Sequence, residues 1–176
     1  MVNINQKKHL KKILILGLDN SGKSSLVFSF QKKNNLSYYT SLEPTRGENI
    51  SKIEDINREF IIWDIGGQVQ HRQDFLNNSK KYILETSKVI FVIDVQDTER
   101  YHVALNYLHE ILDKFKKEKI FVKISVFLHK FDSDLIVDED GVNGLIKKIR
   151  AEIPVEFNYD IVKSSIETIY RKTTII

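Results

Sequence analysis

The stretch KILILGLDNSGKS, from Lys12 to Ser24, places a short apolar run directly before a glycine-rich octet. The run KILIL has the length and aliphatic content of a buried strand. The octet that starts at Gly17 matches the pattern G-x-x-x-x-G-K-[ST], in which two glycines let the backbone curl so that successive N–H groups face phosphate oxygens. The stretch therefore predicts a strand, a phosphate-binding loop and then a helix from Gly22 to Gln31.

Two side chains of this loop have chemistry suited to a bound triphosphate. The Lys23 ammonium can reach the β- and γ-phosphates, and the Ser24 hydroxyl can bind Mg²⁺. The helix that starts here adds the positive end of its dipole. We therefore expect nucleotide contacts along the whole loop, from Asp19, Asn20, Ser21, Gly22, Lys23, Ser24 and Ser25.

Further along the chain, strand-like apolar runs alternate with helical patterns. The runs are Ile50 to Ile56, Glu59 to Trp63, Val89 to Val95, Ile124 to Leu128 and Phe157 to Val162; helical spacing recurs from Tyr101 to Phe115 and from Val142 to Ile149, and a brief helix is predicted from Ser165. This alternation predicts a three-layer α/β fold, with a mostly parallel central sheet of about six strands and helices on both faces. Such sheets bind ligands at the carboxyl ends of their strands.

A second motif, DIGGQ from Asp64 to Gln68, follows the strand-like run FIIW. A carboxylate that ends a strand beside the phosphate loop can hold Mg²⁺ through a water. Gly67 can give its N–H to the γ-phosphate, because no Cβ obstructs the approach. Gln68 carries both a donor and an acceptor, which suits it to orient an attacking water.

The polar stretch from Asn34 to Glu48 has no periodicity and is predicted to be a functional loop. Thr45 follows a proline in this loop, and it can complete the Mg²⁺ coordination and give its N–H to the γ-phosphate. Thr40 is the competing candidate, but it lacks the stiffening proline. Adjacent side chains in extended backbone point in opposite directions, so we expect Arg46 to face solvent.

A third motif, HKFD, follows the run ISVFL and suits the recognition of a purine. The Asp132 carboxylate can accept hydrogen bonds from N1–H and the 2-amino group of guanine, which adenine does not offer in that geometry. The Lys130 stem can lie along the base plane. In the later tripeptide SSI, Ser165 could bring a backbone N–H to guanine O6, although a helix N-cap also explains it. The expected base contacts are His129, Lys130, Asp132, Ser165 and Ile166.

Composition limits the other classes of function. The 176 residues fit one domain, which we assign to residues 12–176 after a basic extension over 1–11. A net charge of +3 without an arginine-rich stripe argues against nucleic acid as a partner. The chain has no cysteine, which excludes disulfides, prenylation and palmitoylation and fits the cytoplasm. Because Val2 stands where myristoylation needs glycine, membrane contact would be weak, peripheral and without a lipid anchor.

With these motifs in order, the chain resembles the small GTPases of the Ras superfamily, closest to the Arf-like and Rag branches. GLDNSGKSS, WDIGGQ and FVIDVQDTER resemble the Arf type, whereas HKFD and SSI are similar to Rag-type proteins, in which His replaces the usual Asn. The likeness covers about residues 12–170 and implies a small G domain that binds GTP or GDP with Mg²⁺. It also implies Mg²⁺ ligation by Ser24 and Thr45, with Asp64 as the outer-sphere Mg²⁺ residue, and guanine contacts from Lys130 and Asp132.

The expected activity is slow hydrolysis of GTP to GDP and phosphate, with catalytic roles for Gln68, Lys23 and Thr45. Such a switch works with effector, exchange-factor and GTPase-activating proteins. Formation of a homo- or heterodimer is left as an alternative. The first alternative is a scaffold that binds GTP without efficient hydrolysis. The second is another P-loop enzyme such as a nucleotide kinase, which the absence of an arginine-rich lid segment disfavours.

Two residues of these motifs carry expectations of their own. His129 replaces the usual Asn, and we expect it to weaken the tether between the base loop and the phosphate loop. Asp19 places a carboxylate near the γ-phosphate, where repulsion would lower the intrinsic rate of hydrolysis.

Overall fold

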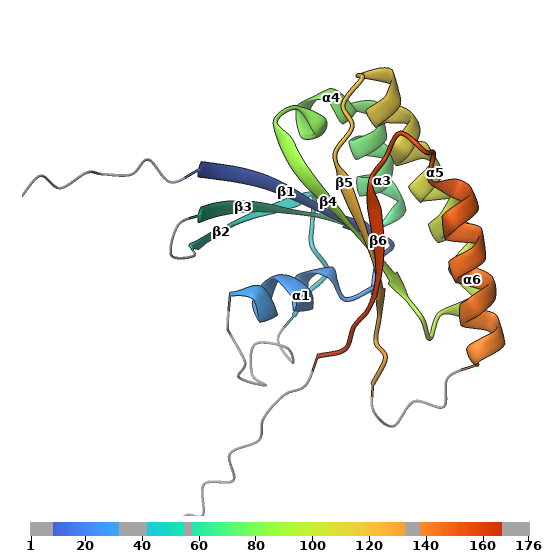
Figure 1. The fold of residues 1–176 in the computed structure, drawn as a ribbon. Helices are drawn as coiled ribbons and strands as arrows, with labels where there is room; N and C mark the ends of the chain where they lie inside the picture. The colour runs from blue at the N-terminus through green and yellow to red at the C-terminus, as the bar shows by residue number, and fades with distance from the viewer. Residues whose placement is uncertain (1–8, 32–41, 55–57, 133–137, 167–176) are drawn as a thin grey trace, which may run out of the picture.

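The computed structural model describes residues 9–31, 42–54, 58–132 and 138–166. Within these ranges six strands form one sheet, in the order β2-β3-β1-β4-β5-β6 (Figure 1). The strands are β1 (His9–Gly17), β2 (Glu48–Glu54), β3 (Arg58–Ile65), β4 (Thr86–Asp94), β5 (Lys123–His129) and β6 (Tyr159–Lys163). The helices are α1 (Lys23–Phe30), α3 (Val69–Asn77), α4 (Ser79–Ile83), the 3₁₀ turn η1 (Thr98–Arg100), α5 (Tyr101–Lys117) and α6 (Glu139–Glu152).

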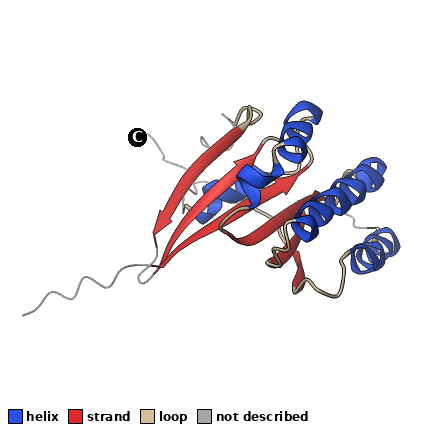
Figure 2. Cartoon of the chain, turned by 90° about the horizontal axis from the view of Figure 1, so that it is seen from above, coloured by secondary structure: helices blue, strands red, loops and turns tan. Residues whose placement is uncertain are grey.

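The sheet is parallel throughout except for its edge strand β2, which pairs antiparallel with β3. The predicted three-layer α/β architecture is therefore confirmed. Helices α5 and α6 cover one face and α1 lies on the other (Figures 1 and 2). Residues 55–57, which include the end of the predicted run Ile50 to Ile56, lie outside the described residues.

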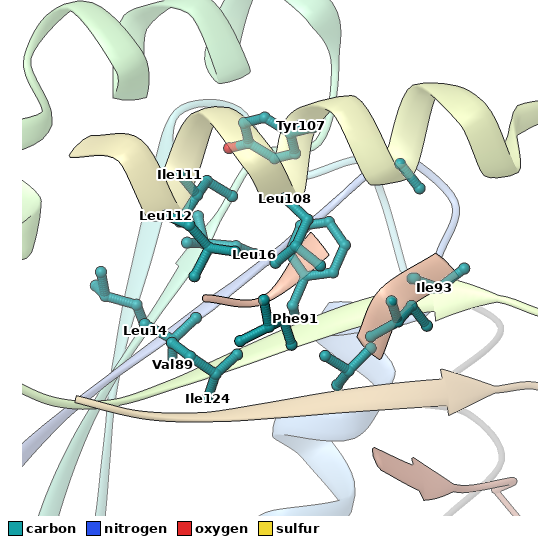
Figure 3. Packing of buried hydrophobic residues seen from close by; sticks show 14 of the residues in the cluster. Leu14, Leu16, Val89, Phe91, Ile93, Tyr107, Leu108, Ile111, Leu112 and Ile124 are labelled. Carbon is teal, nitrogen blue, oxygen red and sulfur yellow. The ribbon is translucent and has the colours of Figure 1, made fainter. Parts of the chain in front are cut away.

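Successive residues of β1 point into two separate cores, as the twofold repeat of a strand requires. Leu14 and Leu16 pack into the larger core, beneath Leu108 and Leu112 of α5 (Figure 3). Ile15 belongs to the smaller core, which α1 covers. A central strand that is buried on both faces must be apolar at every position, which is why KILIL is a continuous run.

Several boundaries differ from the sequence-based predictions, each for a local reason. Strand β1 starts at His9, within the predicted basic extension, because its pairing with β3 extends back to that residue. Helix α6 starts at Glu139, since the side chain of Asp138 caps it by accepting a hydrogen bond from Gly141 N–H at 3.1 Å. Strand β6 starts at Tyr159, because Phe157 still closes a turn onto the Pro154 carbonyl.

Helices α3 and α4 were not predicted. Phe75 is the one buried residue of α3, so the segment lacks the apolar repeat on which the sequence-based assignment relied. The terminal helix predicted from Ser165 lies almost wholly outside the described residues. Within the described ranges, every helix is too short or too polar to cross a bilayer.

Candidate functional site

The glycine-rich loop borders a hollow of about 240 Å³ at the carboxyl end of β1. Its left-handed turns occur at Asn20, with φ 58°, and at Gly22, with φ 89°. Gly22 also has no room for a side chain, since a Cβ there would lie 2.4 Å from His129 Cδ2. The hollow is lined by Asp19, Asn20, Gly22, Lys23, Ser24, Ser25, Leu42, Glu43, Pro44, Thr45, Gly67 and Gln68. Predicted phosphate-end residues from three separate segments thus share one cavity wall.

Lys23 is the buried cation of this hollow, with 6% of its surface exposed. Its Nζ donates to the carbonyl oxygens of Leu18 at 2.6 Å and of Gly17 at 3.2 Å. Burial lowers the pKa of the ammonium to about 8, while the nearby carboxylates of Asp64 and Asp19 act in the opposite direction. A poorly solvated cation beside curled backbone N–H groups is a favourable site for an anion of high charge. Ser21, predicted as a contact, is buried and donates to Leu18 O at 2.9 Å, which shapes the loop.

Three oxygens meet where the hollow borders the end of β3. Ser24 Oγ donates to Asp64 Oδ2 at 2.5 Å and lies 2.9 Å from Thr45 Oγ1, which is itself 3.4 Å from the same carboxylate oxygen. Asp64 is 1% exposed, and burial raises the pKa of its carboxyl group. Its second oxygen, Oδ1, is buried without a hydrogen-bond partner among the described residues. Hydroxyl and carboxylate oxygens are hard ligands, so this donor set fits Mg²⁺ shared with phosphates and waters.

Gly67 lies against the phosphate loop, closer than any other residue type could. A Cβ at this position would lie 2.2 Å from the backbone nitrogen of Asp19 and 2.3 Å from the carbonyl carbon of Leu18. Gln68 follows it as the N-cap residue of α3, half-buried at the wall of the hollow. The two loops predicted to sense a γ-phosphate, around Thr45 and around Gly67, therefore both close on the glycine-rich loop. Thr40, the competing candidate, lies outside the described residues.

The arginines near the hollow are engaged with protein groups or exposed. Arg46 is exposed, as predicted. Arg100 Nη1 donates to Asp19 Oδ1 at 3.0 Å and also pairs with Asp97. The predicted repulsion between Asp19 and a γ-phosphate is therefore reduced by a counter-charge that the sequence analysis did not anticipate.

The HKFD segment lies beside the end of β4, where it contacts Asp94 and the nearby Gln96. Lys130 has a left-handed backbone with φ 66°, and its Nζ lies 2.6 Å from Asp94 Oδ2. Gln96 Nε2 donates to Asp132 Oδ2 at 3.1 Å and to the Lys130 carbonyl at 3.0 Å. The Asp132 carboxylate, predicted to read guanine, is thus held in place from the side.

His129 joins the base loop to the phosphate loop. It is 3% exposed, its ring covers Gly22, and its Nδ1 lies 3.0 Å from Ser164 Oγ. Burial lowers the pKa of the imidazole, with the neighbouring Lys130 charge adding to the effect. The imidazole ring therefore packs against the phosphate loop, whereas a weakened tether and its effect on guanine affinity stay predictions.

The SSI tripeptide lies next to this base loop through backbone hydrogen bonds. Ser164 N–H donates to Leu128 O at 2.9 Å, and Phe131 N–H donates to Ser164 O at 3.1 Å. Ser165 is exposed and Ile166 is half-buried. The HKFD segment and the start of the SSI tripeptide therefore lie side by side.

Three residues of the site were missed by the sequence analysis. Asp94 and Gln96 follow the run VIFVI at the carboxyl end of a strand, a signal that could have identified them. Arg100 had no such signal, because it lies beyond the strand end and its pairing with Asp19 is set by the tertiary fold.

The fold is similar to that of a solved small GTPase. A solved structure, the Arl6 BBS3 small GTPase from Trypanosoma brucei with the bound nucleotide analogue GppNp, has a similar fold, with a TM-score of 0.64. It is 22% identical in sequence, and the match covers 89% of this chain and 87% of that one.

The sequence is also similar to that of several curated proteins. It is 33% identical to ADP-ribosylation factor 1 of Brassica rapa subsp. pekinensis over 136 residues, which is 77% of this chain and 69% of the relative. It is 36% identical to ADP-ribosylation factor-like protein 5 of Caenorhabditis elegans over 101 residues, 57% of this chain but only 52% of that protein. The model of the ADP-ribosylation factor family matches residues 1–168. The chain therefore belongs to the ADP-ribosylation factor family.

Proposed function

We propose that this protein is a molecular switch that binds GTP and hydrolyses it slowly to GDP and phosphate. The main observation behind the proposal is that two loops close on the phosphate loop around the hollow. Thr45 lies 2.9 Å from Ser24 on one side, and Gly67 lies against Asp19 on the other. A γ-phosphate between these loops would contact both, and its loss would release both.

Each group of residues in the site has its own role in hydrolysis. Lys23 and the curled backbone bind the phosphates and stabilise the charge that develops on them. Gln68 orients a water for in-line attack on the γ-phosphorus. Ser24, Thr45 and Asp64 would hold Mg²⁺, which when bound neutralises phosphate charge. Lys23 must carry its positive charge to attract the phosphates. The negative charge of a bound triphosphate favours this charged form.

Regulation by partner proteins follows from the state of the arginines. Arg100 is paired with two carboxylates and Arg46 is exposed, so neither supports a role as an internal arginine finger. Without a finger, turnover is on the order of 10⁻⁴ to 10⁻³ s⁻¹, and a partner that supplies one adds about 10³- to 10⁵-fold. We therefore propose effector, exchange-factor and GTPase-activating partners.

Guanine selection is proposed for the base loop. Asp132, held by Gln96, has the acceptor chemistry that guanine requires, and the His129 contact with Ser164 keeps the loop beside the SSI tripeptide. We propose that this loop works as in Rag-type proteins, with His in place of Asn. We also propose a cytoplasmic location, with contact at a membrane limited to weak attraction of the N-terminal lysines.

Single-turnover hydrolysis tests the proposal directly. The full chain, loaded with GTP and Mg²⁺, should release phosphate slowly, and Gln68→Leu should reduce that rate by about tenfold or more because the water loses its orienting group. Gln73→Leu, on an exposed position of the same helix α3, is the matched control and should leave the rate unchanged. Equal rates for the wild type and Gln68→Leu would favour the scaffold that binds GTP without efficient hydrolysis.

A further inference from the structure

The first turn of α3 is hydrogen-bonded to both loops that close on the hollow. Neither His71 nor Arg72 of this turn lines the cavity. His71 instead accepts the backbone N–H of Gly47 on its Nε2 at 3.3 Å. Arg72 donates from Nε to the carbonyl of Gly67 at 3.0 Å.

One of these contacts is made to a predicted γ-phosphate sensor, Gly67, and the other to a residue close to the second sensor, Thr45. Gly47 lies two residues after Thr45, and its carbonyl accepts the Gly66 N–H at 2.7 Å. Gly67 is itself the residue that lies against the phosphate loop. The bond from His71 therefore requires the Thr45 loop to lie close to α3, and the bond from Arg72 fixes the backbone at Gly67.

Helix α3 has a firm support on its other side. The Arg72 guanidinium lies over the Tyr107 ring, 5.3 Å from its centre. Tyr107 belongs to α5 and is buried in the larger core, with 1% of its surface exposed. Tyr107 in turn packs against Phe91 of β4, with ring centres 6.0 Å apart. A cation held over a buried ring loses little further freedom when it also donates to Gly67, so the contact costs little entropy.

We propose that His71 and Arg72 are positioning residues that hold the Thr45 and Gly67 loops closed, and so set how strongly the site prefers a nucleoside triphosphate to a diphosphate. The inference rests on the proposed function, because it assumes that the loops are released when the γ-phosphate is lost. A contact made only in the closed arrangement adds its free energy to triphosphate binding and nothing to diphosphate binding. Neither side chain needs to touch the nucleotide.

The test is a pair of equilibrium affinities, for GDP and for a non-hydrolysable GTP analogue with Mg²⁺, measured on the full chain. His71→Phe fills the same space without an acceptor, and Arg72→Ala removes the donor. Each should weaken the triphosphate analogue about fivefold, the value of one ordinary hydrogen bond, and leave GDP within about twofold. Gln73→Ala is the control for the exposed surface of the same helix and should change neither affinity.

His71→Gln separates a hydrogen-bonding role from a merely structural one. Its amide oxygen can accept the Gly47 N–H near the position of Nε2, so the triphosphate affinity should return toward the wild-type value. A Thr45→Ala background supplies a second check: with that loop already released, His71→Phe should have little further effect, a non-additive result.

Equal weakening of both nucleotides, no weakening at all, or a His71→Gln variant as weak as His71→Phe would overturn the inference. These outcomes leave the proposed function intact as long as the wild type binds guanine nucleotides. A wild type that binds neither nucleotide contradicts the proposed function itself.

Discussion

The two ends of the site are built in different ways. At the phosphate end, Lys23 and Asp64 are buried, and the fit of Gly67 is decided by backbone atoms. At the base end, Asp132 is exposed and is held by one exposed side chain, Gln96. Buried contacts cannot relax without moving the chain, whereas exposed ones compete with water. We therefore expect substitutions at the phosphate end to change affinity strongly, and those at the base end to change selectivity more modestly.

The largest effect is expected from Gly67→Ala. The new methyl group would lie 2.2 Å from the Asp19 nitrogen, so the loop must move away from the phosphate site. Triphosphate affinity should fall by about 10- to 100-fold, the equivalent of typical overpacking. Isothermal titration with a GTP analogue measures it.

Gly144→Ala is the matched control for that substitution. Gly144 lies in α6 with no atom within 4 Å of the added Cβ, so the variant should bind normally and be slightly more stable. Unchanged affinity in Gly67→Ala would contradict the close fit that defines the phosphate end.

Asp132→Ala should have the next largest effect, on selectivity. Loss of a charged acceptor for guanine should weaken GTP by about tenfold, and binding of ATP should stay as it is. Competition binding with both nucleotides measures the ratio. Asp113→Ala, at an exposed position of α5, serves as the control, and equal losses for both nucleotides would show that Asp132 supports the fold rather than reading the base.

Arg100→Ala tests the charge pair at the phosphate end. Without its partner, the Asp19 carboxylate would repel the bound phosphates, and triphosphate affinity should fall by about threefold, in line with a partly exposed ion pair. Adding Asp19→Asn to Arg100→Ala removes the repelling charge and should restore the affinity. If the double variant binds more weakly than Arg100→Ala alone, repulsion is not the cause.

The smallest effect is expected at His129, the residue that joins the two ends. Burial lowers the pKa of this imidazole in the folded protein, so the unfolded chain takes up the proton first as the pH falls. Stability from this residue is thus fully present above about pH 6.5 and is lost as the pH falls below it. Melting curves of wild type and His129→Asn between about pH 7.5 and 5.5 should diverge at the acid end. Parallel curves would contradict a neutral buried imidazole.

The sequence predicted the parts of the fold that depend on pattern. The continuous apolar runs identified the sheet, and the spacing from Gly17 to Ser24 identified the phosphate loop. The structure brings Asp64 and Gly67 together with that loop, as their positions after a strand predicted, and Thr45 joins them from the loop before β2.

The remainder depended on tertiary contacts that no local pattern encodes. Helix α3 is held by a single buried side chain, Phe75, and by contacts from His71 and Arg72 to distant backbone groups. The pairing of Asp19 with Arg100 joins residues 81 positions apart. Such pairs become visible only when the strand order of the sheet is known.

The most direct test of the account is equilibrium binding of GTP and ATP to the full chain, with Mg²⁺ and with the metal chelated. We predict that GTP binds more tightly than ATP by about 100-fold or more, and that chelation weakens GTP strongly because Ser24, Thr45 and Asp64 lose the ion they share with the phosphates. Equal binding of the two nucleotides, or binding of neither, would contradict the assignment of both ends of the site.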